Sequence, residues 1–192
     1  MRAGWVAALL CGALLLGGCT DDEPDVAAEH PRLLQPDDLP PVEDVTVSEG
    51  SSASKTNCGA MDAERQLAIT GEDETYLNYL LEDGTRVRSA VQGTSMSSDS
   101  IDETFERLDA MIDECVQRNA GTGEFERLEV TEDDAVGFTG ITQTSDGPQT
   151  TERIYARLDD QHAVVVTVVH VGDEPPVTAE ELLPRAMERA RG

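Results

Sequence analysis

Few side chains in this sequence could support covalent catalysis. A thiol beside an imidazole can act as a nucleophile, and Cys115 and His170 are the nominal candidates. Cys115, however, falls on the apolar stripe of a predicted helix, and His170 falls in an apolar predicted strand, where a packed core histidine is typical. The sequence contains no GxSxG, HExxH, P-loop or GxGxxG motif. We therefore expect no enzymatic activity, no catalytic residues and no cofactor.

A different chemistry is indicated at the N-terminus. Arg2 precedes the apolar run Trp5–Leu16, which is shorter than the roughly 20 residues that span a bilayer and is typical of a signal peptide. The run ends in Leu16-Gly17-Gly18-Cys19, which is similar to a bacterial lipobox. Residues 1–18 are therefore predicted to be a lipoprotein signal peptide, and Cys19 to accept a diacylglycerol. The alternative is an ordinary secretory signal with a cysteine at its cleavage site.

Two further cysteines remain in the predicted mature chain, Cys58 and Cys115. In an oxidising compartment the simplest outcome is one disulfide, which closes a loop of 57 residues (115 − 58). Such a crosslink stabilises a fold by about 4 kcal/mol in the chain-entropy model. A metal site is the alternative, but the mature chain offers no CxxC and only three scattered histidines.

Arg86 and Arg88 are predicted to lie on one face of a strand, with Tyr76 and Tyr79 on its hairpin partner. The two tyrosines are three residues apart, so only one of them can share the arginine face of a regular strand. Clustered arginines in so acidic a chain are typical of an anion or carboxylate site. The alternative is a solvated face on which the arginines pair with acids such as Glu82.

The charge balance excludes other partners. Lys+Arg 14 against Asp+Glu 39 gives a net charge of −25, so nucleic-acid phosphates are repelled and no basic patch for anionic lipid is expected. The acidic run Glu132-Asp133-Asp134 lacks the alternating acids and central glycine of an EF-hand. We interpret it as a solvated turn and expect no bound metal.

Turn signals and alternation place the arginines on a hairpin. Tyr76–Leu81 and Thr85–Gln92 flank Glu82-Asp83-Gly84, and an Asp-Gly turn between β-prone runs is a strong hairpin signal. Three later segments predict a β-meander: Ala135–Thr142, Thr150–Leu158 and Ala163–Val171.

Helical periodicity appears twice. Steps of three and four predict a helix over Ile101–Asn119, which opens with a Ser100–Glu103 capping box; its apolar face comprises Ile101, Phe105, Leu108, Ile112 and Cys115. Thr178 and Glu181 open a last helix, which Pro184 interrupts or restarts.

Three regions are therefore predicted. Residues 1–18 form the signal peptide, residues 19–32 a flexible acidic tether, and residues 33–192 a single domain. That domain starts with an extended strap over Leu33–Val47, in which Pro36, Pro40 and Pro41 exclude helix. The segment Met61–Thr70 is ambiguous between a helical turn and a strand. Strands punctuated by helices predict an α+β fold with a largely antiparallel sheet packed against a central and a C-terminal helix.

These features together resemble the PknH-type extracellular sensor domain, which occurs in actinobacterial kinases and small lipoproteins. The resemblance is carried by the lipobox Cys19, the strap Leu33–Pro40, Cys58, the strand Val87–Val91, and a helix ending in Glu114-Cys115. It implies a Cys58–Cys115 disulfide and a cleft for an unknown ligand. No cysteine follows Cys115, whereas kinase-type members often carry a second disulfide there.

We therefore expect a lipid-anchored sensor or binding lipoprotein on the outer face of the cytoplasmic membrane of a high-GC, actinobacterial cell. Its expected partners are the membrane, through the anchor, and a small ligand or an envelope protein. Arg86, Arg88, Tyr76 and Tyr79 are the candidate ligand contacts. The alternatives are a carrier of an apolar molecule such as a lipid and, third, an envelope hydrolase.

Overall fold

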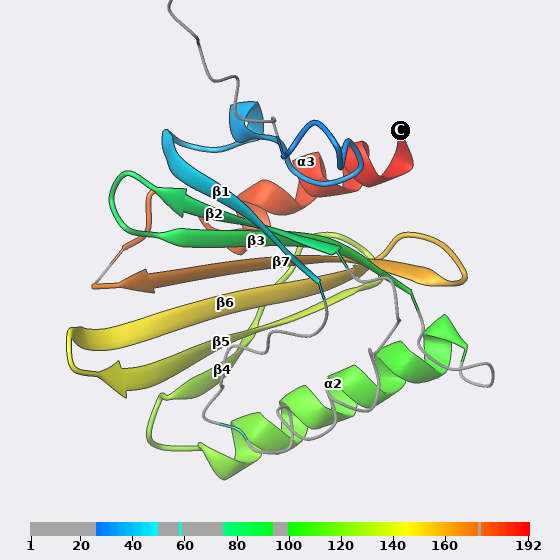
Figure 1. Cartoon of the computed structure of the whole chain (residues 1–192). Helices are drawn as coiled ribbons and strands as arrows, with labels where there is room; N and C mark the ends of the chain where they lie inside the picture. Colours follow the sequence, from blue (N-terminus) through cyan, green and yellow to red (C-terminus); the bar gives the residue numbers. More distant parts are fainter. Residues whose placement is uncertain (1–25, 50–57, 59–74, 94–99, 173) are drawn as a thin grey trace, which may run out of the picture.

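The computed structural model describes residues 26–49, 58, 75–93, 100–172 and 174–192. They form one seven-stranded sheet in the order β1-β2-β3-β7-β6-β5-β4 (Figure 1), in which every neighbouring pair is antiparallel. The predicted α+β class is confirmed. The strands are β1 (Val42–Glu49), β2 (Thr75–Leu81), β3 (Arg86–Gly93), β4 (Phe125–Leu128), β5 (Ala135–Thr144), β6 (Gly147–Arg157) and β7 (His162–Val171).

The two helices, α2 (Ile101–Arg118) and α3 (Ala179–Arg191), cover opposite faces of this sheet (Figure 1). Alternation along the central strand β7 shows this directly, because successive side chains of a strand point to opposite faces. Val164, Val166 and Val168 pack in one core cluster with α3, whereas Val165 packs in a second cluster with α2. We call these two surfaces the α3-side face and the α2-side face.

Both helices begin at the predicted capping boxes. Ser100 Oγ accepts from the Glu103 N–H at 3.2 Å, and Thr178 Oγ1 accepts from the Glu181 N–H at 3.2 Å. These bonds satisfy backbone donors that a helix start otherwise leaves without partners. Pro184 lies inside α3, within a helix that continues past it to Arg191.

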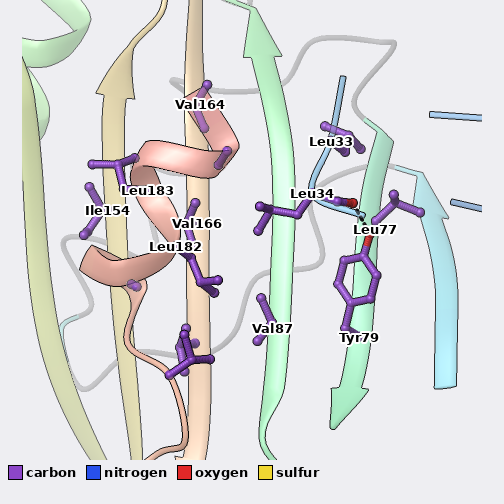
Figure 2. Packing of buried hydrophobic residues seen from close by; sticks show 14 of the residues in the cluster. Leu33, Leu34, Leu77, Tyr79, Val87, Ile154, Val164, Val166, Leu182 and Leu183 are labelled. Carbon is purple, nitrogen blue, oxygen red and sulfur yellow. Dashed lines mark hydrogen bonds between the residues drawn. The ribbon is translucent and has the colours of Figure 1, made fainter. Parts of the chain in front are cut away.

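The α3-side face carries the larger apolar cluster. Leu182 and Leu183 of α3 lie over Ile154 of β6 and Val166 of β7, all at most 2% exposed (Figure 2). Each fully buried Leu, Ile or Val contributes about 1.5–3 kcal/mol. This cluster is the main hydrophobic core of the domain.

The N-terminal segment completes that core. Ala27 and Leu34 are buried, and the hydroxyl of Tyr79 donates to the Leu34 carbonyl (Figure 2). Arg32 donates from Nε and Nη2 to the Ala190 carbonyl, at 3.1 and 3.0 Å, and so caps the C-terminal end of α3. The predicted tether boundary at residue 32 is therefore wrong: the described part of that segment, residues 26–32, is packed on the domain.

The predicted extended strap also differs in detail. Pro36–Asp38 forms a short 3-10 turn, η1, because a proline is compatible with the first turn of a helix. The last part of the strap, from Val42 on, belongs to β1, the edge strand beside β2, which the sequence pattern did not separate from an extended connection.

The α2-side cluster is smaller and is crosslinked. Cys58 and Cys115 pair as a disulfide with their Cα atoms 5.7 Å apart, and both cysteines are buried. This confirms the predicted pairing. Phe125 of β4 stacks on Phe138 of β5 with ring centroids 4.9 Å apart, beneath the helix.

The hairpin and the meander are confirmed, and β4 was missed. At the hairpin turn, Gly84 has a φ of +87°, which glycine adopts without strain. The segments predicted as the signal peptide, the lipidated Cys19 and the ambiguous Met61–Thr70 lie outside the described residues. Within the described ranges, no helix is long and apolar enough to cross a membrane.

Candidate functional site

Helix α2 packs chiefly on β4 and β5, at one end of the α2-side face. Beyond it the sheet carries a hollow of about 390 Å³, which we call the arginine hollow. Four strands line it, β1, β2, β3 and β7, together with the start of β6. Its lining is mixed: seven residues are polar or charged, and Tyr79, Leu80, Val87 and Val169 supply the apolar part. The polar residues are Asp44, Thr46, Asn78, Arg86, Arg88, Gln149 and Thr167.

Strand register builds the floor of this hollow. Asn78 of β2 lies opposite Arg88 of β3, Arg88 lies opposite Thr167 of β7, and Thr167 lies opposite Arg153 of β6. Directly opposed side chains in an antiparallel sheet lie on the same face and within contact distance. The result is a continuous polar row across four strands in an otherwise apolar sheet interior.

Arg88 occupies the centre of the row. Its Nε donates to Asn78 Oδ1 at 2.7 Å, and its guanidinium carbon lies 5.3 Å from the centroid of the Tyr76 ring. Burial lowers the pKa of Arg88, the nearby positive charges of Arg153 and Arg86 lower it further, and Tyr76 opposes the shift. Like charges have thus been brought together at this point of the sheet.

Arg86 and Arg153 flank that centre. Arg86 Nη2 donates to Gln149 Oε1 at 3.0 Å. Arg153 is only 3% exposed, and its Nε donates to Thr167 Oγ1 at 2.9 Å. Among the residues that the structure describes, neither arginine forms an ion pair.

The four predicted contacts do not all belong to this site. Arg86 and Arg88 line the hollow, and Tyr76 stacks beneath Arg88 on the same face. Tyr79 also borders the hollow, but its side chain points into the opposite core, where its hydroxyl bonds to Leu34 (Figure 2). Tyr79 is therefore corrected from a candidate ligand contact to a core residue, and the expectation that only one tyrosine shares the arginine face is confirmed.

The site also contains residues that the sequence did not single out. Thr167 interrupts a run of valines on β7, and Arg153 alternates with the buried Ile154 on β6. Both residues could have been singled out from the sequence, because a polar residue in an apolar strand requires a hydrogen-bond partner. Only the pairing of β6 with β7, and of β7 with β3, shows that they join Arg88.

The candidate thiol–imidazole pair does not form. Cys115 is engaged in the disulfide on the α2-side face, whereas His170 follows the parity of Val168 and lies on the α3-side face. Two hydroxyls, from Thr46 and Thr167, line the hollow without a histidine or cysteine beside them. No group of His, Cys, Asp or Glu within the described residues could hold a metal ion. The guanidinium groups of Arg86 and Arg88 give the hollow donors suited to an anionic oxygen.

No protein-family model matches this sequence, and no curated protein matches it either.

Proposed function

We propose that the protein is a lipid-anchored lipoprotein at the outer face of the cytoplasmic membrane, whose domain binds a small ligand and catalyses no reaction. The arginine hollow is the observation that carries this proposal. Side chains in and beside it are held in place by hydrogen bonds that join different strands, so little conformational freedom remains to be lost when a ligand binds. The resemblance to the PknH-type sensor domain, with its cleft for an unknown ligand, agrees with such a role.

The short connection to the predicted anchor supports a membrane-proximal domain. Ala27 is buried in the core of the domain, and the first described residue is Val26. About seven residues of chain lead from Cys19 to Val26. A fully extended chain spans at most about 3.3–3.6 Å per residue, which limits this reach to roughly 25 Å. The ligand of the hollow is therefore expected in the space immediately outside the membrane.

The two alternatives receive less support. A carrier of an apolar molecule needs a largely apolar cavity, whereas charged and amide side chains line the arginine hollow. An envelope hydrolase needs a nucleophile within reach of a base, and the hollow offers threonines without a histidine.

Metabolic labelling with a fatty-acid probe tests the anchor. The wild-type protein should become labelled and the Cys19→Ala variant should not, because the thiol of Cys19 is the predicted acceptor. A wild-type protein that remains unlabelled contradicts the lipoprotein assignment.

Ligand recovery tests the binding role. The wild-type protein and the Arg86→Gln variant are purified from native envelope under mild conditions, and the small molecules that accompany each are compared by mass spectrometry. A compound enriched with wild type and depleted with Arg86→Gln supports the proposal. The matched control is Arg118→Gln. It removes an exposed arginine at the end of α2 that does not line the hollow, and this variant should retain the compound. Equal recovery from all three proteins, or turnover of ester, peptide or glycoside substrates that survives repurification, contradicts it.

A further inference from the structure

The arginines that the structure describes have different kinds of partner: carboxylates, backbone carbonyls, as for Arg32 and Arg185, and neutral side-chain oxygens. Away from the hollow, five of them pair with carboxylates: Arg118, Arg127, Arg157, Arg189 and Arg191. At the hollow, Arg86 donates to the amide oxygen of Gln149, and the neighbouring Arg153 donates to the hydroxyl of Thr167. Acids outnumber bases by 39 to 14, so carboxylate partners are abundant in this chain, yet within the described residues Arg86 and Arg153 bond to neutral side-chain oxygens.

A neutral partner orients a guanidinium without consuming its charge. Arg86 uses one Nη2 hydrogen for Gln149, and Arg153 uses its Nε hydrogen for Thr167. A guanidinium has five N–H donors, so donors remain on Arg86 for an anionic oxygen. Within the described residues, two positive charges are thus fixed beside the hollow without an ion pair.

Thr167 connects the buried charge to the ligand space. Its Oγ1 accepts from Arg153, so its own hydroxyl hydrogen is directed elsewhere, and Thr167 lines the hollow. A charged donor polarises the hydroxyl that accepts from it and makes that hydroxyl a stronger donor in turn. Arg153 can therefore act on a bound anion through Thr167 while remaining buried itself.

The spacing is that of a small molecule. Arg88 and Arg153 are separated by one intervening strand, so their Cα atoms lie about 10 Å apart, and Arg86 and Arg88 are about 7 Å apart along β3. Leu80 and Val169 supply apolar contact between these positions, and Asp44 marks the β1 end, where an anion is disfavoured. An anion is thus confined to the part of the hollow over β3, β7 and β6.

From this arrangement we propose that the arginine hollow binds a compact dianion, either a short dicarboxylate or a phosphate monoester, with Arg86 and Thr167 in contact and Arg153 acting through Thr167. The proposal rests on the binding function proposed above and names its ligand class. Two cations without ion pairs call for two negative charges, and planar guanidinium groups match both carboxylate and phosphate oxygens. The net charge of −25 disfavours extended polyanions, which cannot remain confined to the hollow.

Calorimetric titration of the full mature protein in a neutral detergent tests this class. Malonate, inorganic phosphate and acetate are compared at matched ionic strength and about pH 8, where phosphate is mainly dianionic. At least one dianion should bind tenfold or more tightly than acetate, a difference of about 1.4 kcal/mol. Preference for malonate identifies a dicarboxylate site, and preference for phosphate a phosphate site.

Variants separate a role in binding from a role in folding. Arg86→Gln should weaken the preferred dianion about tenfold and acetate by less, while Arg86→Lys, which keeps the charge, should recover part of the loss. Without ligand, Arg86→Gln should melt no lower than wild type, because it relieves repulsion with Arg88 and Arg153. Arg118→Gln should bind like wild type. If Arg86 serves only to hold β3 near β6, Arg86→Gln lowers the melting temperature and leaves the ratio of dianion to acetate affinity unchanged.

Other outcomes are equally decisive. Acetate binding as tightly as both dianions, or no measurable binding of either dianion, overturns the dianion proposal. If a neutral compound is recovered from the envelope in an Arg86-dependent manner, the binding function stands and the ligand class is wrong. If no compound is recovered and no anion binds, both proposals fail.

Discussion

The two faces of the sheet are built differently, although the same strands supply both. The α3-side face is covered by α3 and by the N-terminal segment, and its side chains pack into an apolar core (Figure 2). The α2-side face is covered by α2 at one end (Figure 1). At its other end it carries the arginine hollow. Strand β7 thus points buried valines to the α3-side face, whereas its Thr167 lies in the polar row on the α2-side face.

This difference shows how a rigid polar site can be maintained. The polar row is supported from behind by the apolar core, because each of the side chains Asn78, Arg88, Thr167 and Arg153 lies next in sequence to a buried apolar residue. Arg153 is preceded by Glu152, which accepts from the Ala179 N–H at the start of α3, and followed by the buried Ile154. Because the opposite face holds these side chains in position, they lose little conformational freedom when a ligand binds.

Removal of the disulfide has the largest expected effect. Because the crosslink closes a loop of 57 residues, the double variant Cys58→Ala/Cys115→Ala should lower the free energy of unfolding by about 2–5 kcal/mol. The melting temperature should fall by roughly 5–15 °C, measurable by circular dichroism. Thiol titration of the denatured, unreduced, lipidated mature protein should find no free thiol, because the Cys19 thiol carries the predicted diacylglycerol and Cys58 is paired with Cys115.

The same variant tests whether the two faces of the sheet unfold separately. Hydrogen exchange should increase first in α2, while amides of β7 and α3 stay protected, since the crosslink belongs to the α2-side cluster alone. Equal loss of protection in α3 would show that the two faces unfold as one unit.

Truncation in the opposite core is expected to have a slightly smaller effect. Leu182→Ala removes a side chain that is 2% exposed and leaves a cavity between α3 and the sheet, so stability should fall by about 2–4 kcal/mol in denaturant unfolding. Affinity for the preferred anion should remain within twofold of wild type under conditions where the variant is folded. Glu188→Ala, on the exposed side of α3, is the matched control and should change neither quantity.

The smallest effect is expected where the N-terminal segment contacts α3. Burial alone raises the pKa of Asp38, but hydrogen bonds from Arg189 and from the Gln35 N–H outweigh it, and the pKa is lowered. A carboxyl whose pKa is lowered on folding stabilises the protein above its unfolded pKa near 3.9, and this stabilisation is lost as the pH falls through the lower folded value.

Asp38→Asn should therefore cost about 0.5–1 kcal/mol at neutral pH and approach zero cost in strong acid. Paired urea titrations at neutral and acidic pH measure this, with Asp37→Asn as the neighbouring control. A cost that is independent of pH would assign the loss to packing rather than to the ion pair.

Local patterns predicted much of the fold because their causes are local. The hairpin follows from Asp83-Gly84, α2 from its capping box and its apolar stripe, and the pairing of Cys58 with Cys115 from the small number of cysteines. Short or edge elements were different. β4 is four residues long, with a glutamate and an arginine in its middle, and it exists because Phe125 packs on Phe138 rather than because its own pattern favours a strand.

The site divides in the same way. Period-two alternation was sufficient to put Arg86 and Arg88 on one face, and to limit that face to one of the two tyrosines. Which tyrosine it is, and that Arg153 and Thr167 complete the row, depended on strand order and register, including the pairing of Arg88 with Thr167, 79 residues further along the chain (167 − 88). Propensity and periodicity act over a few residues and can be read from the sequence. Contacts across the sheet, in contrast, exist only after β7 has inserted between β3 and β6.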